Sequence, residues 1–448
     1  MTTTLKISPI IGNSQARRAA AASFFGSMLE FYEFFIYATA ASLVFGHIMF
    51  PEESDVGALL SLATFGVAYI ARPLGALIFG HIGDTIGRRA TLIISLIMMG
   101  TATVLIGFLP TYHQIGIAAP IVLVVLRILQ GISAAGESAG SASLTIEQAP
   151  EGRRGLFGSS VTSGVAVGFV LASLVFLPIM ALPEEDLLAW GWRIPFWLSS
   201  IILIVAYFIR RRIEEPEVFA ESRRTGHTSK MPIVAVVRDW WRDLLRVTGA
   251  CLFLAVQALM TVFALGYVPA TTTITSSDML WVWIIANAVS AVLMPVAGML
   301  SDRYGRKPIF ITGCISLAVS VFVFFNAVGT GSLLLVGLAG VLTMGVCYSF
   351  ANGVYPAFFP EMFNVRVRYS GYAISLQLGL IVTGFTPTAA QSLVGVGVGP
   401  AWFLPATLGA ALALVAAATA WTAKETAHLP LHELGTDRNL RLGKRRIS

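Results

Sequence analysis

Long runs of apolar residues recur along this chain, and they constrain its fold more than any other feature of the sequence. A helix needs about 20 mostly apolar residues to cross the hydrocarbon core of a bilayer. Charged residues make up 12% of the chain, against about a quarter in an ordinary soluble protein. The sequence therefore predicts an integral membrane protein with twelve spanning helices, at residues 19–45, 57–80, 90–109, 120–145, 157–180, 194–209, 247–268, 279–300, 308–328, 332–355, 370–393 and 400–422.

Cysteine spacing and side-chain chemistry argue against several other classes of protein. Cys251, Cys314 and Cys347 lie far apart inside apolar runs, which fits neither a disulfide framework nor a zinc site. The sequence contains no evident soluble domain, metal-ligand cluster or nucleophile beside a base, so we expect neither an enzyme nor a cofactor. The polar N-terminus has no short apolar core before a small-residue cleavage site, and we expect no removable signal peptide.

Lysine and arginine predict the orientation, because loops rich in these residues are retained on the cytoplasmic side. They fall in the N-terminal tail, in every second loop and in the C-terminal tail, whereas the opposite loops carry acids such as Glu52, Glu184 and Asp278. We therefore expect an even number of spans with both termini in the cytoplasm. This asymmetry also accounts for the net charge of +6, so nucleic acid is not an expected partner.

An internal repeat divides the chain into two parts. GHIGDTIGRR at residues 80–89 recurs as GMLSDRYGRK at residues 298–307, each between the second and third spans of a set of six. Repeated halves with a site between them at the membrane midplane are typical of secondary transporters. We predict an N-terminal tail at 1–18, a six-helix half at 19–209, a cytoplasmic linker at 210–246, a second six-helix half at 247–423 and a basic cytoplasmic tail at 424–448.

The repeated motif resembles the loop motif of the major facilitator superfamily, G-x-x-x-D-R-x-G-R-[RK]. Other segments are similar to the metabolite:proton symporter family within it, namely LEFYEFFIY, RPLGALIFGHIGD, RILQGISAAGESAGSA, WGWRIPFWLSS and PEMFNVRVRYSG. That family consists of bacterial carriers for small carboxylates, such as shikimate, oxoglutarate or citrate, or for zwitterionic osmolytes. The resemblance implies an all-α fold of two six-helix halves, alternating access, and a place in the bacterial plasma membrane.

Two carboxylates lie inside the first predicted span, in FFGSMLEFYEFFIY. Glu30 and Glu33 are three residues apart and therefore share one face of a helix. A carboxylate at the middle of a membrane helix costs about 2.5 to 3.5 kcal/mol, and acids at this depth commonly mark proton or substrate pathways. We predict that Glu30 and Glu33 form a proton-coupling pair. The alternative is a buried ion pair that braces the first helix.

Arginines inside the spans supply the opposite charge. Arg127 and, ten residues further on, Glu137 are assigned to proton coupling, because the resemblance places the first and fourth helices at the transport cavity. A guanidinium can hold a carboxylate through two parallel hydrogen bonds. We predict that Arg72 binds the substrate in this way, with Arg127 as a second candidate. The alternative for both arginines is that they only hold helices together.

Charged residues near the repeat are predicted to form a gate. An aspartate there can meet a helix N-terminus or an arginine across the cytoplasmic face, which suits a latch that breaks when the carrier opens inward. The predicted gating residues are Asp84, Arg88, Arg89, Asp302, Arg306, Lys307, Glu147 and Glu361.

The second half offers neutral polar groups in its spans. Neutral donors and acceptors can orient the hydroxyls or ring of a substrate, although each could instead bond a neighbouring helix. The predicted substrate-binding residues of this half are Gln257, Tyr348, Asn352, Tyr355 and Gln377.

These features predict a proton-coupled symporter that imports a small organic acid. The alternative is an uptake carrier for a zwitterionic osmolyte such as betaine or proline. The expected partners are the organic anion and the proton, and we expect a monomer. The basic segments VVRDWWRDLLR and LRLGKRRIS are expected to rest on anionic lipid at the cytoplasmic surface.

Overall fold

The fold consists of helices throughout the part of the chain that the computed structural model describes, which is residues 13–51, 57–86, 88–135, 138–211, 232–364, 367–396, 399–430 and 434. The helices before residue 212, called here the N-terminal helices, are α1 (Asn13–Leu43), α2 (Phe45–Ile48), α3 (Gly57–Ile86), α4 (Arg88–Gly107), α5 (Tyr112–Ile115), α6 (Ala118–Ala134), α7 (Ser138–Gln148), α8 (Arg154–Met180), α9 (Glu184–Ala189) and α10 (Ile194–Arg211).

The helices after residue 231 are called here the C-terminal helices. They are α12 (Pro232–Asp239), α13 (Trp241–Ala250), α14 (Leu254–Ala258), α15 (Ala264–Thr271), α16 (Ser276–Tyr304), α17 (Arg306–Gly329), α18 (Leu333–Gly340), α19 (Tyr348–Asn352), α20 (Tyr355–Glu361), α21 (Arg368–Ser392) and α22 (Phe403–Trp421).

Many of these helices have the length and composition of membrane spans. Within the described ranges, eight helical stretches are long and apolar enough to cross a bilayer: Gly57–Phe79, Arg154–Met180, Trp241–Thr271, Ser276–Tyr304, Arg306–Gly329, Leu333–Glu361, Arg368–Ser392 and Phe403–Trp421. Two shorter apolar helices are Ile93–Gly107 and Ala118–Ala134. Large apolar side chains such as Val292, Leu334 and Trp421 are exposed on these helices, as expected for a surface that contacts lipid.

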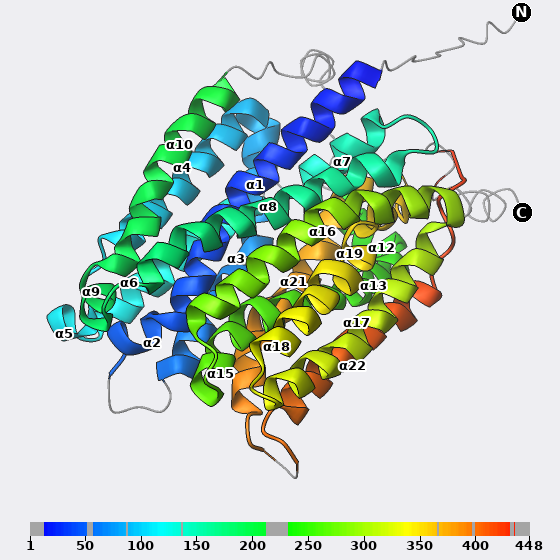
Figure 1. The fold of residues 1–448 in the computed structure, drawn as a ribbon. Coiled ribbons are helices and arrows are strands. Elements are labelled where there is room, and N and C mark those ends of the chain that lie inside the picture. Colours follow the sequence, from blue (N-terminus) through cyan, green and yellow to red (C-terminus); the bar gives the residue numbers. More distant parts are fainter. Residues whose placement is uncertain are drawn as a thin grey trace, which may run out of the picture.

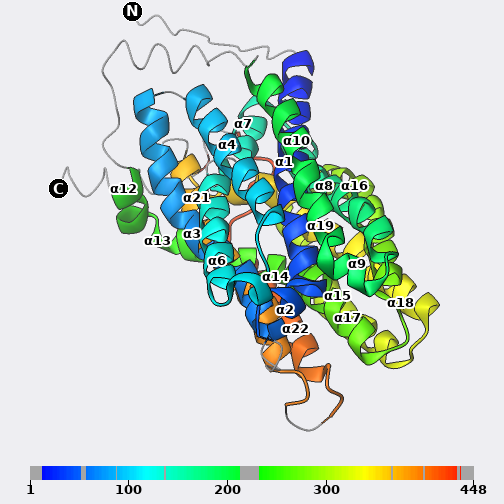
Figure 2. The same cartoon turned by 90° about the vertical axis from the view of Figure 1, so that its left-hand side faces the viewer.

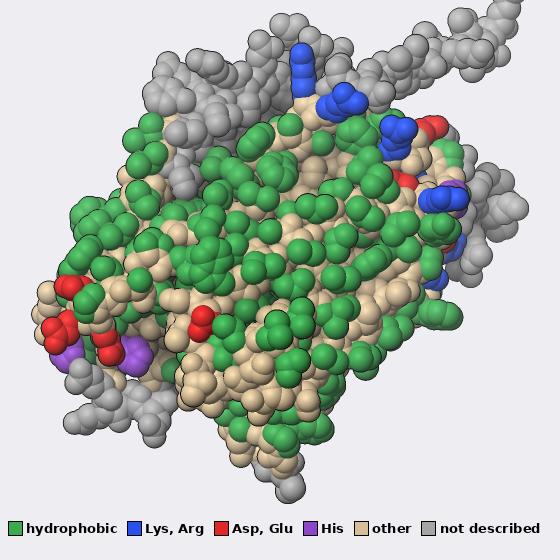
Figure 3. Space-filling view, viewed as in Figure 1, with side chains coloured by type: hydrophobic (Ala, Val, Ile, Leu, Met, Phe, Trp, Pro, Cys, Tyr) green, Lys and Arg blue, Asp and Glu red, His purple; other side chains and the backbone are tan. Residues whose placement is uncertain are grey.

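The long helices lie side by side and form one bundle (Figure 1). Two pairs join the N-terminal to the C-terminal helices, because α8 packs along α16 and α3 packs along α21. α1 contacts both α3 and α8 (Figure 2). On the face shown in Figure 3, Lys and Arg side chains gather at the end of the bundle where α1 begins, together with a few acidic ones. The charged side chains at the opposite end of this face are acidic or histidine, and a mostly hydrophobic band lies between the two ends.

Glycines allow α3 and α6 to approach each other closely. A Cβ atom on Gly131 would lie 2.0 Å from the carbonyl oxygen of Ala68, and a Cβ on Gly75 would lie 2.0 Å from that of Ile132. Real Cβ atoms are not found at such distances from a carbonyl oxygen, so the backbones meet where only glycine fits. α1 and α8 meet in the same way at Gly164, where a Cβ would lie 2.2 Å from the carbonyl oxygen of Phe24.

The predicted span at 120–145 corresponds to α6 and α7, and residues 136 and 137 between them lie outside the part of the chain that the structure describes. Two predicted spans differ from regular helices. The spans at Trp241–Thr271 and Leu333–Glu361 each contain a π-helical turn, at Leu259–Phe263 and Val341–Cys347. Such turns often occur at functional sites in membrane and soluble proteins.

The close contact between α3 and α6 can be tested with Gly131→Ala. The added methyl group forces the two backbones apart, so we expect a loss of about 1 to 3 kcal/mol of stability and a lower Tm in detergent. Gly337→Ala is the matched control, because the nearest atom to its Cβ, in Val282, is 3.8 Å away. A Gly131→Ala variant as stable as Gly337→Ala would contradict this packing.

Candidate functional site

Four charged side chains are buried in the middle of the described N-terminal helices: Glu30 and Glu33 on α1, Arg72 on α3 and Arg127 on α6. Arg72 is one turn from Gly75, and Arg127 is one turn from Gly131, so the contact between α3 and α6 brings the two arginines together. The ring of Phe34 lies 5.0 Å from Arg72 Cζ and 4.9 Å from Arg127 Cζ. The structure therefore brings both predicted arginines to one aromatic ring, on the helix that also carries both predicted acids.

Arg127 is held by hydrogen bonds from each of its three side-chain nitrogens. Nη2 donates to the carbonyl oxygen of Phe65 at 3.1 Å, Nε to that of Thr64 at 3.4 Å, and Nη1 to Gln130 Oε1 at 2.9 Å. The guanidinium also lies over the Tyr37 ring, with Cζ 3.7 Å from the ring centre. Arg127 thus ties α6 to the backbone of α3, which favours a structural or coupling role over direct contact with a substrate.

A chain of hydrogen bonds connects Arg127 to Glu33. Gln130, which accepts from Arg127, donates through Nε2 to Thr103 Oγ1 at 2.7 Å. Thr103 Oγ1 lies 2.9 Å from Glu33 Oε2 as a donor, and 2.9 Å from the carbonyl oxygen of Met99. We call Arg127, Gln130, Thr103 and Glu33 the relay. It links α6, α4 and α1, and it joins Glu33 to Arg127 through two neutral side chains.

Arg72 differs from Arg127 in its hydrogen bonding. Its side chain is only 1% exposed, yet Nε and Nη2 have no hydrogen-bond partner. These two nitrogens lie on the same edge of the guanidinium, the edge that binds a carboxylate through two parallel hydrogen bonds. The rings of Phe34 and Tyr69 flank the group, with Cζ 4.9 Å from the centre of Tyr69. Since buried donors without partners are costly, this edge is the place where an anion would be accepted.

The C-terminal helices bring neutral groups to the same region. The Tyr355 hydroxyl lies close enough to Glu30 and Arg72 for their charges to act on it. Gln377 on α21 is 1% exposed, and neither its amide oxygen nor its nitrogen has a hydrogen-bond partner. Tyr348 donates to Gln257 Oε1 at 3.0 Å. These residues can meet the uncharged part of a ligand.

Asn352 fits the packing alternative better than the predicted binding role. Its Nδ2 lies 3.6 Å from the sulfur of Met294 on α16, and a helical break at Gly353 separates it from Tyr355 on the next helix.

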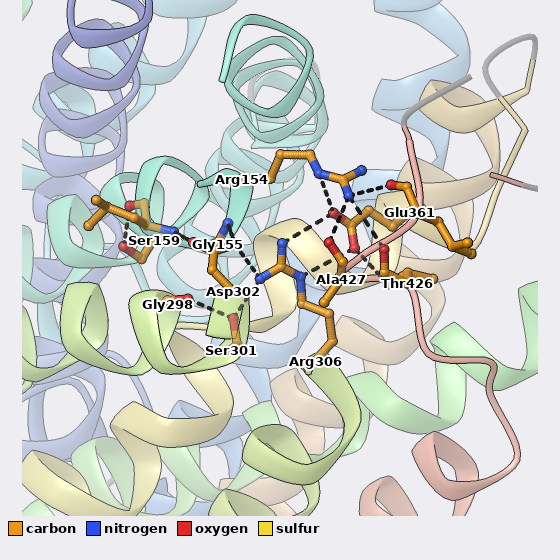
Figure 4. Close-up of polar contacts among 12 residues, drawn as sticks. Arg154, Gly155, Ser159, Gly298, Ser301, Asp302, Arg306, Glu361, Thr426 and Ala427 are labelled. Carbon is orange, nitrogen blue, oxygen red and sulfur yellow. Dashed lines mark hydrogen bonds and ion pairs between the residues drawn. The ribbon is translucent and has the colours of Figure 1, made fainter. Parts of the chain in front are cut away.

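A second cluster of charges lies at the basic end of the bundle and joins the two sets of helices (Figure 4). Asp302 accepts hydrogen bonds from the backbone N–H groups of Gly155 and Leu156, at 2.8 and 2.9 Å, in the first turn of α8. The carboxylate thus sits at a helix N-terminus, where negative charge is stabilised. Arg306 donates to the same carboxylate at 2.7 Å.

Glu361 lies between two arginines in this cluster. Arg154 Nε is 3.3 Å from Oε1 of Glu361, and Arg306 Nε is 3.3 Å from Oε2. Thr426, in the segment after α22, donates to Oε2 at 2.6 Å. Arg154 belongs to the N-terminal helices and Glu361 to the C-terminal helices, so this ion pair spans the interface between them.

The segment after the last helix is part of the same cluster. Glu425 accepts from the backbone N–H groups of Arg306 and Lys307 at the start of α17, at 2.8 and 3.0 Å, and from those of Thr426 and Ala427. Burial disfavours the ionised form of Glu425, but these four hydrogen bonds outweigh burial and lower its pKa. We call Arg154, Asp302, Arg306, Glu361 and Glu425 the end cluster.

The other predicted gating residues lie beside the end cluster or outside the residues that the structure describes. Lys307 is half-buried and donates through Nζ to the carbonyl oxygen of Trp421 at 2.9 Å. Glu147 is exposed and lies 3.7 Å from Arg368. Glu137, and the side chains of Asp84, Arg88 and Arg89, are outside the part of the chain that the structure describes.

Sequence reasoning missed Thr103, Gln130, Arg154 and Glu425. Gln130 could have been predicted from the sequence, because it is three residues from Arg127 on the same helical face. Thr103 carries no such signal, since threonines in membrane helices are common and its partners come from two other helices. Arg154 was used only to orient the loops, and Glu425 was assigned to a tail expected to lie on lipid.

Comparisons with known proteins agree on one family. The model of the Major Facilitator Superfamily matches residues 23–383. The Shikimate transporter of Escherichia coli is 36% identical over 426 residues, covering 92% of this chain and 95% of that protein. The Proline/betaine transporter of the same organism is 33% identical over 447 residues, covering 96% and 87%.

A solved structure agrees with the fold. A partially occluded, inward-open structure of the xylose transporter XylE from Escherichia coli superposes with a TM-score of 0.73, at 17% identity, and covers 93% of this chain and all of that chain.

The relay can be tested with Thr103→Val. Valine has nearly the same shape but removes the hydroxyl, which leaves the Gln130 donor unpaired, so we expect a loss of about 1 to 3 kcal/mol of stability. The Tm in detergent should fall accordingly. Thr103→Ser keeps the hydroxyl and should restore most of the lost stability. If the serine variant is as impaired as the valine variant, the hydroxyl is not the group that matters.

Glu425 is expected to stabilise the fold in a pH-dependent way. Its lowered pKa means that its contribution is present above the ordinary carboxyl pKa, about 4.3, and is lost as pH falls through the lowered value. Glu425→Gln should therefore lower Tm at pH 7, and the difference from wild type should shrink below about pH 4. Glu151→Gln, at an exposed position in a turn, is the control for charge. A Tm difference that does not change with pH would contradict this role.

Proposed function

As a member of the major facilitator superfamily, the chain is a multi-pass membrane transporter and not an enzyme, and we propose that it is a proton-coupled symporter that imports a small organic acid. The predicted resemblance is confirmed by the matched family model and by the similarity to transporters of small metabolites. The Shikimate transporter of Escherichia coli, 95% of which is covered, is named for a hydroxylated acid. This similarity supports an organic acid as the substrate.

We further propose that twelve helices cross the bacterial plasma membrane, with both termini in the cytoplasm. α1, α4, α6 and α10 would complete the eight stretches that are long and apolar by themselves. The collection of Lys and Arg side chains at one end supports this orientation (Figure 3), because positively charged loops stay in the cytoplasm. The two halves would then be residues 19–209 and 247–423, joined by the linker at 210–246.

The observation that carries the proposed substrate class is the unpaired edge of Arg72. Its Nε and Nη2 are buried and lack partners, and a carboxylate supplies two acceptor oxygens at the matching separation. The flanking rings of Phe34 and Tyr69 exclude water from the guanidinium. An organic acid bound there would face Tyr355 and the C-terminal helices with its uncharged part.

We assign proton coupling to Glu30 and Glu33. Both are buried on α1, and two carboxylates three residues apart on a helix titrate as a pair. A proton taken up from outside would reduce the negative charge of Glu30 and Glu33 and so weaken their attraction for Arg72. Arg72 would then be available for the substrate. The relay supports this assignment, because it connects Glu33 to Arg127 through Thr103 and Gln130.

Inward opening would require the end cluster to separate. Asp302 would leave the N-terminus of α8, and Arg154 would leave Glu361, since both contacts join the two halves. Release of the acid and its proton into the cytoplasm would follow, and the empty carrier would close the end cluster again. Alternating access of this kind is common to transporters built from repeated halves.

The second candidate is a carrier for a zwitterionic osmolyte, supported by the 33% identity to a Proline/betaine transporter. A quaternary ammonium is usually bound over aromatic faces. Here the guanidiniums of Arg72 and Arg127 lie within 5.0 Å of the Phe34 ring, so that ring already has cationic neighbours. This arrangement favours an anion over a zwitterion.

Anionic lipid is a further proposed partner. α12 and the start of α13 carry the exposed side chains Arg238 and Trp241 beside Arg242. Basic and aromatic side chains of this kind interact with lipid headgroups.

The proposed function predicts that an inward proton gradient drives accumulation of a labelled acid in proteoliposomes. Shikimate is the first probe, followed by other hydroxylated monocarboxylates. Glu33→Gln should abolish gradient-driven uptake but retain exchange of internal for external substrate, because exchange needs no net proton transfer. Glu184→Gln, in the exposed acidic loop, should have no effect. Accumulation that survives in both Glu30→Gln and Glu33→Gln would show that these carboxylates do not carry the proton.

A further inference from the structure

The buried charges in the middle of the described helices balance each other. Glu30 and Glu33 carry two negative charges when ionised, and Arg72 and Arg127 carry two positive charges. The remaining buried charged residues, Arg154, Arg306, Glu361 and Arg368, lie at the basic end of the bundle. In the described C-terminal helices, charged residues occur only near the ends of the spans. Among the described residues, the empty central cluster therefore holds as many acidic as basic side chains.

The cluster offers donors without partners for one carboxylate. Every side-chain nitrogen of Arg127 already donates a hydrogen bond, to Thr64, Phe65 or Gln130. Only Arg72 has donors without partners, and these form a single edge of the guanidinium. One edge binds one carboxylate.

The surroundings of that edge do not suit a second acidic group. The groups that the C-terminal helices offer on this side are neutral: the unpartnered amide of Gln377 on α21, which packs along α3, the Tyr355 hydroxyl, and the Tyr348 hydroxyl already paired with Gln257. Thr383 on α21 adds a buried hydroxyl without a partner. These groups can bond hydroxyls or carbonyls, but a second carboxylate among them would be a buried charge without a counter-ion, which is strongly unfavourable.

From this inventory we propose that the carrier moves one monoanionic carboxylate with one proton per cycle, so that neither the loaded nor the empty carrier transfers net charge. The proposal rests on the proposed function and specifies its substrate class and stoichiometry. A monoanion on Arg72 leaves the cluster with one excess negative charge, and one proton on the pair Glu30 and Glu33 removes it. A zwitterion would add no net charge, so a proton carried with it would make the loaded cluster positive.

The first experiment separates this inference from the proposed function. The purified full-length chain is reconstituted in proteoliposomes with labelled shikimate, or with whichever hydroxylated monocarboxylate is accumulated, and the proton gradient and membrane potential are imposed independently. We expect uptake to follow the proton gradient, to change less than twofold with a potential of either sign, and to take up one proton per substrate.

The outcomes have different meanings. If no acid is accumulated in response to a proton gradient, the proposed function fails and this inference with it. If proton-driven uptake occurs but a potential also drives it, or if the proton count differs from one, the inference alone is overturned. Concentrative uptake of labelled succinate as its dianion would likewise overturn the limit to one carboxylate.

A variant provides a sharper test. In Glu33→Gln the empty cluster carries one excess positive charge, and binding of the monoanion makes it neutral without a proton. Net uptake should then lose its dependence on the proton gradient and become faster with an inside-positive potential, while exchange persists. Glu30→Gln should behave in the same way if the pair shares the proton, and Glu184→Gln should remain insensitive to potential. Variants that retain exchange without acquiring this response to potential would overturn the charge balance.

Discussion

The structure depends on the rule that a charge placed among membrane helices must be compensated nearby, because water is not available to solvate it. The central cluster satisfies the rule with two acids on α1 and two arginines beside Phe34 of the same helix. This arrangement requires the backbones of α3 and α6 to meet, which Gly75 and Gly131 permit. Two small residues without side-chain chemistry therefore determine whether the charged side chains can neutralise one another.

The same rule is satisfied differently at the basic end of the bundle. There the arginines, the acids and the backbone N–H groups of two helix N-termini complete one another's hydrogen bonds. Asp302 and Glu425 each cap a helix, and Glu361 lies between Arg154 and Arg306. The centre retains an unpaired edge on Arg72, whereas the end cluster binds parts of the chain to each other. One site is suited to a ligand and the other to holding two sets of helices together.

Much of this organisation was predictable from the sequence, and the exceptions have physical causes. Long apolar runs located the helices, and Glu30, Glu33, Arg72 and Arg127 were conspicuous because charge is rare at this depth. The π-helical turns in two of the spans were not predicted, since hydropathy does not detect a local change of helical geometry. Thr103 and Gln130 were missed because their importance comes from partners on other helices. Glu425 was missed because a polar segment after the last span gives no sign that it folds back onto α17.

The π-helical turns in Leu259–Phe263 and Val341–Cys347 have a consequence for how this chain can be compared with others. A π-helical turn contains about one residue more than an α-helical turn, so it rotates everything beyond it by about 100° relative to a regular helix. The second of these turns directly precedes Tyr348, which donates to Gln257. A homologue that lacks one residue in this turn would present a different side of the helix at the same depth. Residues aligned by sequence beyond it would then face lipid in one protein and the substrate in the other, so a length change of one residue could alter specificity without any substitution.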